Sequence, residues 1–209
     1  KIPKLPERKA SSGKLLLQVS DLSTQGTERT KLKKLNFSLH SGEILGIAGV
    51  EGNGQEALIE VLAGLIPIES GTIKSSFDRT RGLRLIPPDR HQDGLLLTES
   101  VEDNFLLGKT RKPALNYGPW LNRKAIHAWA KNLYDNFQVA PKNENALQEP
   151  IASLSGGNQQ KVIIARETDE SFDLLVAAHP TRGVDIGAID FIHQYFMQLK
   201  SRGVGILLI

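Results

Sequence analysis

Residues 154–161 read Leu-Ser-Gly-Gly-Asn-Gln-Gln-Lys, and this run has the features that a phosphate-binding helix start requires. Ser155 is a favoured N-cap residue, and its hydroxyl can also donate a hydrogen bond. Gly156 and Gly157 allow a ligand to approach the backbone closely. Free N–H groups and the positive end of the helix dipole favour an anion at such a position. The predicted chemistry is recognition of a phosphate, with Gln159 in the polar first turn.

A second glycine-rich segment, residues 49–56, has the G-x-x-x-x-G spacing of a P-loop and lies between a predicted strand and a predicted helix. Gln55 stands where a P-loop has its lysine, and Glu56 stands where it has the Ser or Thr that binds Mg²⁺. Gln55 carries no charge, while Glu51 and Glu56 add negative charge. We expect a loop of P-loop shape that binds ATP weakly, or else a structural glycine turn that binds no nucleotide. The candidate nucleotide-binding residues of this segment are Gly49, Gly52, Asn53, Gly54, Gln55 and Glu56.

The run at 154–161 resembles the signature motif of ABC-type ATPases, in the form found in sugar and nucleoside importers. Residues 174–185, Leu-Leu-Val-Ala-Ala-His-Pro-Thr-Arg-Gly-Val-Asp, resemble the Walker B strand and D-loop of the same family. In the family that strand ends in Asp-Glu, where the Asp orders Mg²⁺ and the Glu polarises the attacking water. Here Ala178 takes the Asp position and can bind no metal, and His179 takes the Glu position as a polar strand-end residue or a base. The resemblance therefore implies a site that has abandoned hydrolysis, with no confident catalytic residue and no metal ligand.

Two further residues follow from the resemblance. Asp89, in the run Pro-Pro-Asp-Arg, falls where the family's Q-loop joins the catalytic core to a helical insert, and a simple turn is the alternative. Asp185 ends the D-loop-like segment and would couple two nucleotide sites across a cassette interface. Family members also carry an adenine-stacking aromatic residue in the loop that corresponds to residues 23–32, and this loop contains none.

The resemblance covers about residues 15–209 and is closest to the second cassette of fused double-cassette ATPases in ribose, galactose and nucleoside importers. It implies an α/β, P-loop NTPase fold of the ABC-ATPase type, with a mostly parallel core sheet, an antiparallel β edge and an inserted α-helical subdomain. It implies ATP and Mg as cofactors, bound weakly or not at all at this cassette's own site. Ser155, Gly156 and Gly157 would then clamp an ATP that the partner cassette holds.

The implied partners are a first ATP-binding cassette on the same or a second chain, transmembrane permease subunits and, indirectly, an extracytoplasmic solute-binding protein. No nucleic acid is expected, and the protein is placed at the cytoplasmic face of the membrane as a peripheral subunit. Two other classes of function stay open. One is a docking or dimerisation cassette that binds no nucleotide, and the other is a soluble ABC ATPase that acts on nucleic acid or ribosomes.

Alternating strands and helices must position these residues, and they predict a mostly parallel sheet. We expect a linker at residues 1–14, an ATP-binding core at 15–98 and 165–209, and a helical signature subdomain at 99–164. The last segment, residues 204–209, is a buried-strand pattern at the end of the chain, which suggests a fragment of a longer protein. The predicted strands are 15–19, 35–39, 43–48, 82–86, 174–178 and 204–209, and the predicted helices are 55–65, 120–137, 158–168 and 186–199.

The composition excludes several classes of protein. The chain has 209 residues, of which 40% are hydrophobic and 23% charged, so it can bury a real core. Its formal net charge of +3 and its lack of a long basic block argue against nucleic acid binding. It has no cysteine, which excludes disulfides and cysteine-ligated metals. No apolar run reaches membrane-spanning length, so any link to a membrane must run through a partner.

Overall fold

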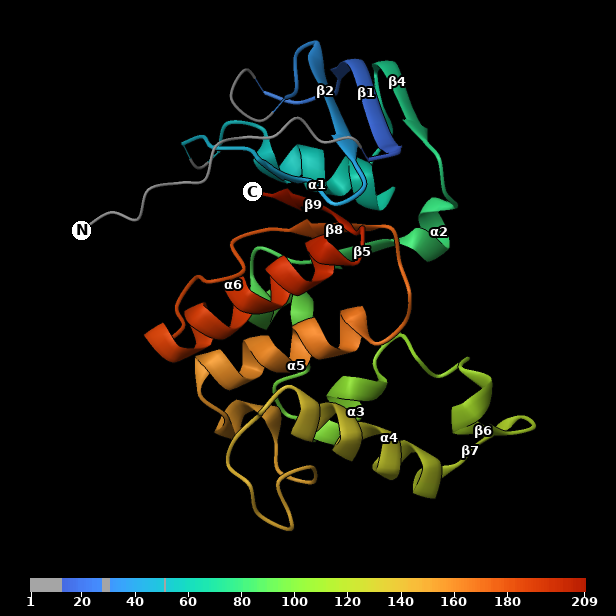
Figure 1. Cartoon of the computed structure of the whole chain (residues 1–209), viewed down its shortest axis with the longest axis vertical. Coiled ribbons are helices and arrows are strands. Elements are labelled where there is room, and N and C mark those ends of the chain that lie inside the picture. The colour runs from blue at the N-terminus through green and yellow to red at the C-terminus, as the bar shows by residue number, and fades with distance from the viewer. Residues whose placement is uncertain (1–12, 28–30, 51) are drawn as a thin grey trace.

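The computed structural model describes residues 13–27, 31–50 and 52–209. The predicted linker at 1–14 lies outside these ranges except for its last two residues, and Glu51 lies outside them as well. Three antiparallel strands form one outer layer of the molecule, in the order β2 (Leu35–His40), β1 (Leu15–Ser23) and β4 (Ser70–Ser75) (Figure 1). Leu17 and Val19 of β1 are buried and Gln18 between them is exposed, as expected for a strand with one face against a core. The predicted antiparallel edge is confirmed.

Four parallel strands form the central sheet, in the order β3 (Ile44–Gly46), β9 (Gly205–Leu208), β8 (Leu174–Ala177) and β5 (Leu83–Ile86). Every residue of β8 is buried, because both faces of this sheet are covered. Leu174 and Val176 enter one apolar core, whereas Leu175 and Ala177 enter the other. The apolar runs that predicted buried strands therefore follow from a sheet that lies between two layers.

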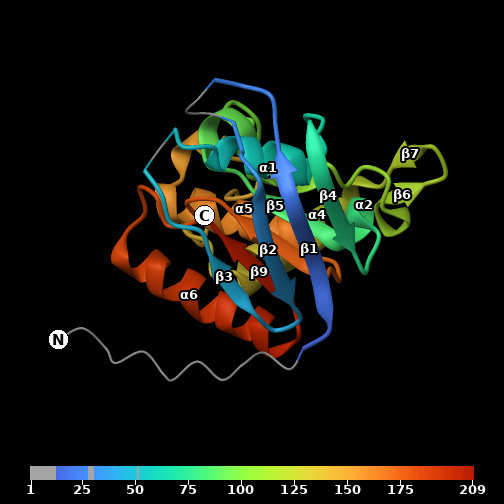
Figure 2. The ribbon, with the colours of Figure 1, turned by 90° about the horizontal axis from the view of Figure 1, so that it is seen from above.

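Helices cover both faces of the parallel sheet (Figures 1 and 2). Helix α1 (Gln55–Ala63) lies between the two sheets and contributes its apolar residues to the core that they share. Helices α5 (Gly156–Thr168) and α6 (Ile186–Ser201) cover the opposite face. Beyond α5 lie α3 (Val101–Leu106) and α4 (Arg123–Asn136), together with a small hairpin of β6 (Asn116–Tyr117) and β7 (Trp120–Leu121). Short elements complete the chain: α2 (Arg79–Gly82), a π-helical turn (Arg90–Gly94) and 3₁₀ turns at Pro113–Leu115 and Ile151–Ser153.

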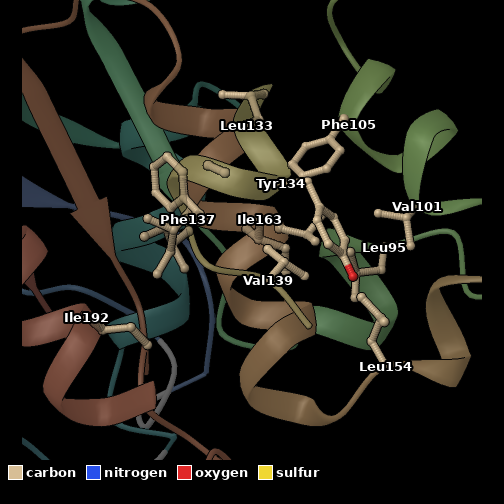
Figure 3. Close-up of a cluster of buried hydrophobic side chains, with 14 of the residues drawn as sticks. Leu95, Val101, Phe105, Leu133, Tyr134, Phe137, Val139, Leu154, Ile163 and Ile192 are labelled. Atoms are coloured by element: carbon tan, nitrogen blue, oxygen red, sulfur yellow. The ribbon is translucent and has the colours of Figure 1, made fainter. Parts of the chain in front are cut away.

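The second core fastens α5 in place from several sides (Figure 3). Four residues belong to one cluster that continues to the parallel sheet: Phe105 of α3, Leu133 of α4, Phe137 at the C-cap of α4 and Ile163 of α5. Four consecutive residues of α5, Val162 to Ala165, are fully buried, so this helix has no wholly exposed face at its centre. The loop at the start of α5 is therefore attached to an immobilised helix.

One predicted helix boundary was wrong. The pattern placed a helix at residues 120–137, but Trp120 and Leu121 pair with β6 across a two-residue Gly-Pro turn. The helix begins only after Asn122, whose side chain accepts a hydrogen bond from the N–H of Ala125. An Asn N-cap and a preceding turn thus overrode the apolar periodicity.

The observed architecture confirms the predicted α/β fold with a parallel core sheet, an antiparallel sheet and additional helices. Most predicted elements are present with shorter or shifted ends, and the signature helix begins at Gly156 rather than at residue 158. Within the described ranges, no helix is long and apolar enough to cross a bilayer.

Candidate functional site

Three candidate segments follow parallel strands at the edge where the carboxyl ends of those strands meet, and the fourth is the start of α5. The glycine loop at 49–54 follows β3, the Asp89 turn follows β5, and residues 178–185 follow β8. Ligands of open α/β sheets bind at this edge. The order β3-β9-β8-β5 places β9 between the glycine-loop strand and β8.

The glycine loop has backbone angles that only glycine adopts without strain. Gly52 has φ 85° and Gly54 has φ 92°, both in the left-handed region. Gly54 is the N-cap of α1 and provides no side-chain cap, and the first helical bond runs from Leu58 N to its carbonyl at 3.0 Å. Exposed Glu56 occupies the first turn of α1, where its charge stabilises the helix dipole without a ligand.

Gln55 folds back across this loop instead of pointing out of it. Its Oε1 accepts a hydrogen bond from the N–H of Asn53 at 3.0 Å, and its Nε2 donates to the carbonyl of Val50 at 3.0 Å. Nε2 also lies 2.5 Å from the point where a Cβ on Gly49 would stand, so the amide fills the inside of the turn. The loop thus satisfies part of its own hydrogen-bonding capacity, and the residue at the lysine position brings no charge.

The Walker B-like strand end has no carboxylate that could bind a metal ion. Ala178 is fully buried in the core that α1 shares, and its N–H donates to Ile86 O at 3.0 Å. His179 has φ 44°, an uncommon conformation for a non-glycine residue, and its side chain is exposed. A buried methyl group and an exposed imidazole do not form a Mg²⁺ site. Ala178 and His179 therefore provide no carboxylate for Mg²⁺ at this strand end.

The start of α5 has the geometry of a phosphate-facing helix end. Ser155 is exposed and caps the helix through its Oγ, which lies 3.4 Å from the N of Asn158 and also accepts from Asn158 Nδ2 at 2.9 Å. The first helical bond is from Gln159 N to Ser155 O at 2.9 Å, so the N–H groups of Gly156 and Gly157 precede the hydrogen-bonded helix. Gly156 is half-buried and Gly157 is buried, and neither N–H takes part in the hydrogen bonds of the helix. No acidic residue lies in this first turn.

Asp185 lies directly beside the signature glycines. Its Oδ2 is 2.5 Å from the point where a Cβ on Gly157 would stand, and Ala188 Cβ is 2.8 Å from the same point. Asp185 is also the N-cap of α6, because its Oδ1 accepts from the N–H of Ala188 at 2.9 Å. The structure thus brings the signature loop and the D-loop-like segment together, and it gives Gly157 a steric reason to be glycine.

The carboxylate of Asp89 forms hydrogen bonds within its own turn. Its Oδ1 accepts hydrogen bonds from the N–H groups of His91 at 2.8 Å and Gln92 at 3.1 Å. The bonds from Gln92 and then His91 hold the pKa of this exposed carboxyl below its usual range. The turn that the sequence left as the alternative at Asp89 is therefore present, and it keeps the residue ionised.

Gln159 and Arg90 differ from expectation. The side chain of Gln159 is buried within the protein, with Nε2 donating to Ile151 O at 3.2 Å and Oε1 2.9 Å from His91 Nε2. Arg90 was not predicted as a site residue, yet its guanidinium lies at the start of α5 and contacts residues 182 and 183. The sequence signal was weak, since a single Arg after Pro-Pro-Asp has no characteristic spacing to the signature motif.

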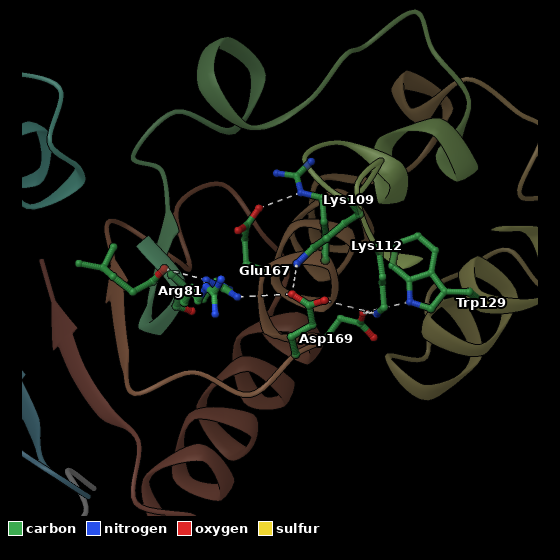
Figure 4. Close-up of polar contacts among 10 residues, drawn as sticks. Arg81, Lys109, Lys112, Trp129, Glu167 and Asp169 are labelled. Atoms are coloured by element: carbon green, nitrogen blue, oxygen red, sulfur yellow. Dashed lines mark hydrogen bonds and ion pairs between the residues drawn. The ribbon is translucent and has the colours of Figure 1, made fainter. Parts of the chain in front are cut away.

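A large cavity lies elsewhere, beside β5, α2 and the segment that follows α3. It has a volume of about 1300 Å³, and six cationic side chains line it. Part of its charge is paired: Lys112 contacts Asp169, and Lys109 Nζ lies 3.6 Å from Glu170. Figure 4 shows Lys112 and Trp129 approaching Asp169 together, with the Trp129 Nε1 donating at 3.0 Å. We call this cavity the basic cleft, defined by Arg79, Arg81, Arg84, Lys109, Arg111 and Lys112.

Comparisons with known proteins show the family of this chain. The family model described as ABC transporter matches residues 32–182. The chain is 36% identical over 217 residues to the nucleoside import ATP-binding protein NupA of Lactococcus lactis subsp. cremoris and to the guanosine import ATP-binding protein NupO of Bacillus subtilis. These alignments cover 98% and 99% of this chain but 42% of each relative, so the chain spans less than half the length of these relatives.

Solved structures give the same fold. A structure titled as the ATP binding subunit of an ABC transporter superposes with a TM-score of 0.69 at 25% identity, covering 92% of this chain and 78% of that one. A second, described as an inward-facing conformation of a putative metal-chelate type ABC transporter, has a TM-score of 0.71 at 22% identity and supports the fold alone. It covers 93% of this chain and 73% of that chain.

Proposed function

Since the chain belongs to the ABC transporter family of ATP-binding domains, we propose that it is the ATP-binding component of an importer for nucleosides or simple sugars. We further propose that it is the second cassette of a fused double-cassette protein. The relatives NupA and NupO are more than twice as long as the part that matches this chain, which leaves room in them for a further cassette. Their printed names assign them to nucleoside and guanosine import, and a ribose import ATP-binding protein is 33% identical.

The two glycine-rich turns would have different tasks in this assembly. Two cassettes would close head to tail, so that each ATP lies between one P-loop and the signature loop of the other cassette. The single observation that carries the proposal is the helix start at Ser155, with the N–H groups of Gly156 and Gly157 outside the helical bonding. These residues would hold the γ-phosphate of an ATP bound by the partner cassette. The mechanism of this chain is thus to orient and stabilise that phosphate.

The glycine loop at 49–54 would bind ATP weakly or not at all. The Gln55 amide bonds within the loop, and Ala178 offers no metal ligand, so no catalytic step is assigned to this site. Mg-ATP belongs to the partner's P-loop in this proposal. A cassette that docks without binding any nucleotide is the second candidate, and the self-bonded loop is the observation that favours it.

The helical side of the molecule would face a membrane permease. We propose that residues 89–104 form part of this surface and that the basic cleft receives an acidic segment of that subunit, since the six cations of the cleft exceed the three carboxylates of residues 167–170 beside it. We retain the division into a core at 15–98 and 165–209 and a signature subdomain at 99–164. Helix α5 runs through the later boundary and would link the two parts rigidly. This assembly would place the chain at the cytoplasmic face of the membrane.

A calorimetric titration of the chain with Mg-ATP tests the assignment of a silent loop. We expect a dissociation constant weaker than about 0.1 mM, because the loop lacks lysine, a metal ligand and an adenine-stacking residue. The variant Gln55→Lys should still show no hydrolysis, since the metal and the attacking water remain unassisted. Micromolar binding with magnesium-dependent hydrolysis by the unaltered chain would refute the proposed silent site. Revival of hydrolysis by Gln55→Lys alone would contradict our interpretation of Ala178 and His179.

A further inference from the structure

Arg90 connects three segments that come from different parts of the chain. Its Nη1 donates to the carbonyl of Arg182 at 2.6 Å, and its Nη2 donates to that of Gly183 at 3.2 Å. The same Nη2 lies 2.8 Å from the point where a Cβ on Gly156 would stand. The guanidinium therefore lies between the turn after β8 and the first residue of α5.

This contact explains a glycine that phosphate recognition alone does not require. A Cβ at residue 156 would also stand 2.7 Å from the carbonyl oxygen of Gly183, which is backbone and cannot rotate away. Gly183 itself has φ 64°, so the turn has a backbone conformation that favours glycine. Gly156 thus leaves space for Arg90 and for the carbonyl that Arg90 binds.

The planar guanidinium is the group that suits two consecutive carbonyls. Its donors form a rigid fork, whereas a lysine offers one ammonium on a flexible stem. Arg90 Nε is buried and has no hydrogen-bond partner among the described residues. The Nε donor is therefore left unsatisfied, while the two Nη groups donate to the carbonyls of residues 182 and 183.

A second contact attaches the same turn to the same helix. His91 Nε2 lies 2.9 Å from Gln159 Oε1, one turn along α5, and Gln159 is buried and also donates to Ile151 O. Asp89 stabilises the turn from inside by accepting from His91 N and Gln92 N. The turn at 89–94 is therefore joined to α5 through His91 and to the segment before α6 through Arg90.

We propose that Arg90 is a positioning residue that holds the 182–185 segment against the first turn of α5. The signature glycines, Asp185 and the 89–94 turn then move as one body. The consequence for transport rests on the proposed function. A shift of the turn at Asp89, on the surface assigned to the permease, would displace Ser155 to Gly157, where the partner's ATP would lie.

Site-resolved hydrogen exchange on the chain tests this coupling. In Arg90→Gln we expect exchange at least about tenfold faster at the N–H groups of Arg182, Ala188 and Gln159, with unchanged rates in the ladder between β8 and β9. Arg90→Lys should give an intermediate increase, because one ammonium can keep one of the two carbonyls. Arg84→Gln is the matched control, since Arg84 Nη1 also donates to two carbonyls, those of Arg81 and Leu83, in a remote place.

The outcomes separate a local clamp from a general contribution to stability. Unchanged exchange at residues 182 and 188 would overturn the proposal, and so would an equal increase throughout the parallel sheet. If Arg90→Gln does not fold, Arg90→Lys provides the same local test. The exchange result concerns Arg90 alone and does not depend on ATP. Failure of the proposed function would instead be seen as intact ATPase activity in a signature-loop variant whose fold is unchanged.

Discussion

Two glycine-rich turns of this chain precede helices, and they differ in the direction that their polar side chain takes. At the start of α5, the Ser155 hydroxyl bonds forward to Asn158 and leaves the N–H groups of two glycines ahead of the helix. At the start of α1, the Gln55 amide bonds backward to Asn53 and Val50. The polar side chain of the first turn, the outward turn, thus leaves backbone N–H groups unused, whereas that of the second turn, the inward turn, bonds to the backbone of its own loop.

The charges beside the two turns differ in the same sense. Glu56 lies exposed in the first turn of α1, where a carboxylate competes with any anion for the positive end of the dipole. The first turn of α5 has no acidic residue. The first turn of α1 thus carries its own carboxylate, whereas the carboxylate nearest to the start of α5 is Asp185, which is the N-cap of α6. Unused N–H groups and the lack of an acidic residue within the turn itself favour α5 over α1 as the phosphate site.

The largest expected effect comes from placing a carboxylate at the outward turn. Gly156→Asp in the intact transporter should lower ATP hydrolysis by at least about 100-fold, because the new charge faces the phosphate and its Cβ meets Gly183 O. ATPase assays on the purified complex measure this loss, with thermal unfolding of the chain measured in parallel. Activity within about twofold of the unaltered protein would remove the distinction between the turns.

A matched pair of truncations tests the two turns with less disturbance of the backbone. Ser155→Ala removes the cap and the hydroxyl, and it should lower transporter ATPase activity about tenfold and chain stability by about 1 kcal/mol. Gln55→Ala removes the inward amide and should leave ATPase activity within about twofold. Equal losses in the two variants would show that both turns contact nucleotide. The unfolding midpoint of each variant separates lost function from lost fold.

Much of this comparison could be predicted from residue types, because glycine spacing and an N-cap serine act locally. The parallel sheet and the turn at Asp89 were predictable for the same reason: apolar runs and Pro-Pro-Asp are local signals. The inward bond of Gln55 was not, since its amide can point either way until the loop closes. Arg90 depends on carbonyls 92 and 93 residues away in the sequence, and no local pattern encodes such a contact. Trp120 was misplaced because pairing with β6 across the adjacent Gly-Pro turn outweighed a helical period.

The smallest expected effect concerns Asp89, the acidic residue at the same sheet edge as the inward turn. Its native pKa lies below the ordinary value of about 3.9, because backbone donors at Gln92 and His91 favour the ionised form. Its contribution to stability is therefore complete above the ordinary value and is lost as the pH falls through the lowered one. Asp89→Asn keeps a capping oxygen but no charge, so its small deficit in unfolding midpoint should be present at neutral pH and vanish in strong acid. Thermal unfolding of both proteins across this pH range provides the measurement. A deficit that persists in strong acid would contradict the assigned carboxylate cap, and a carboxyl titration that shifts when excess Mg²⁺ is added would instead place a metal at this edge.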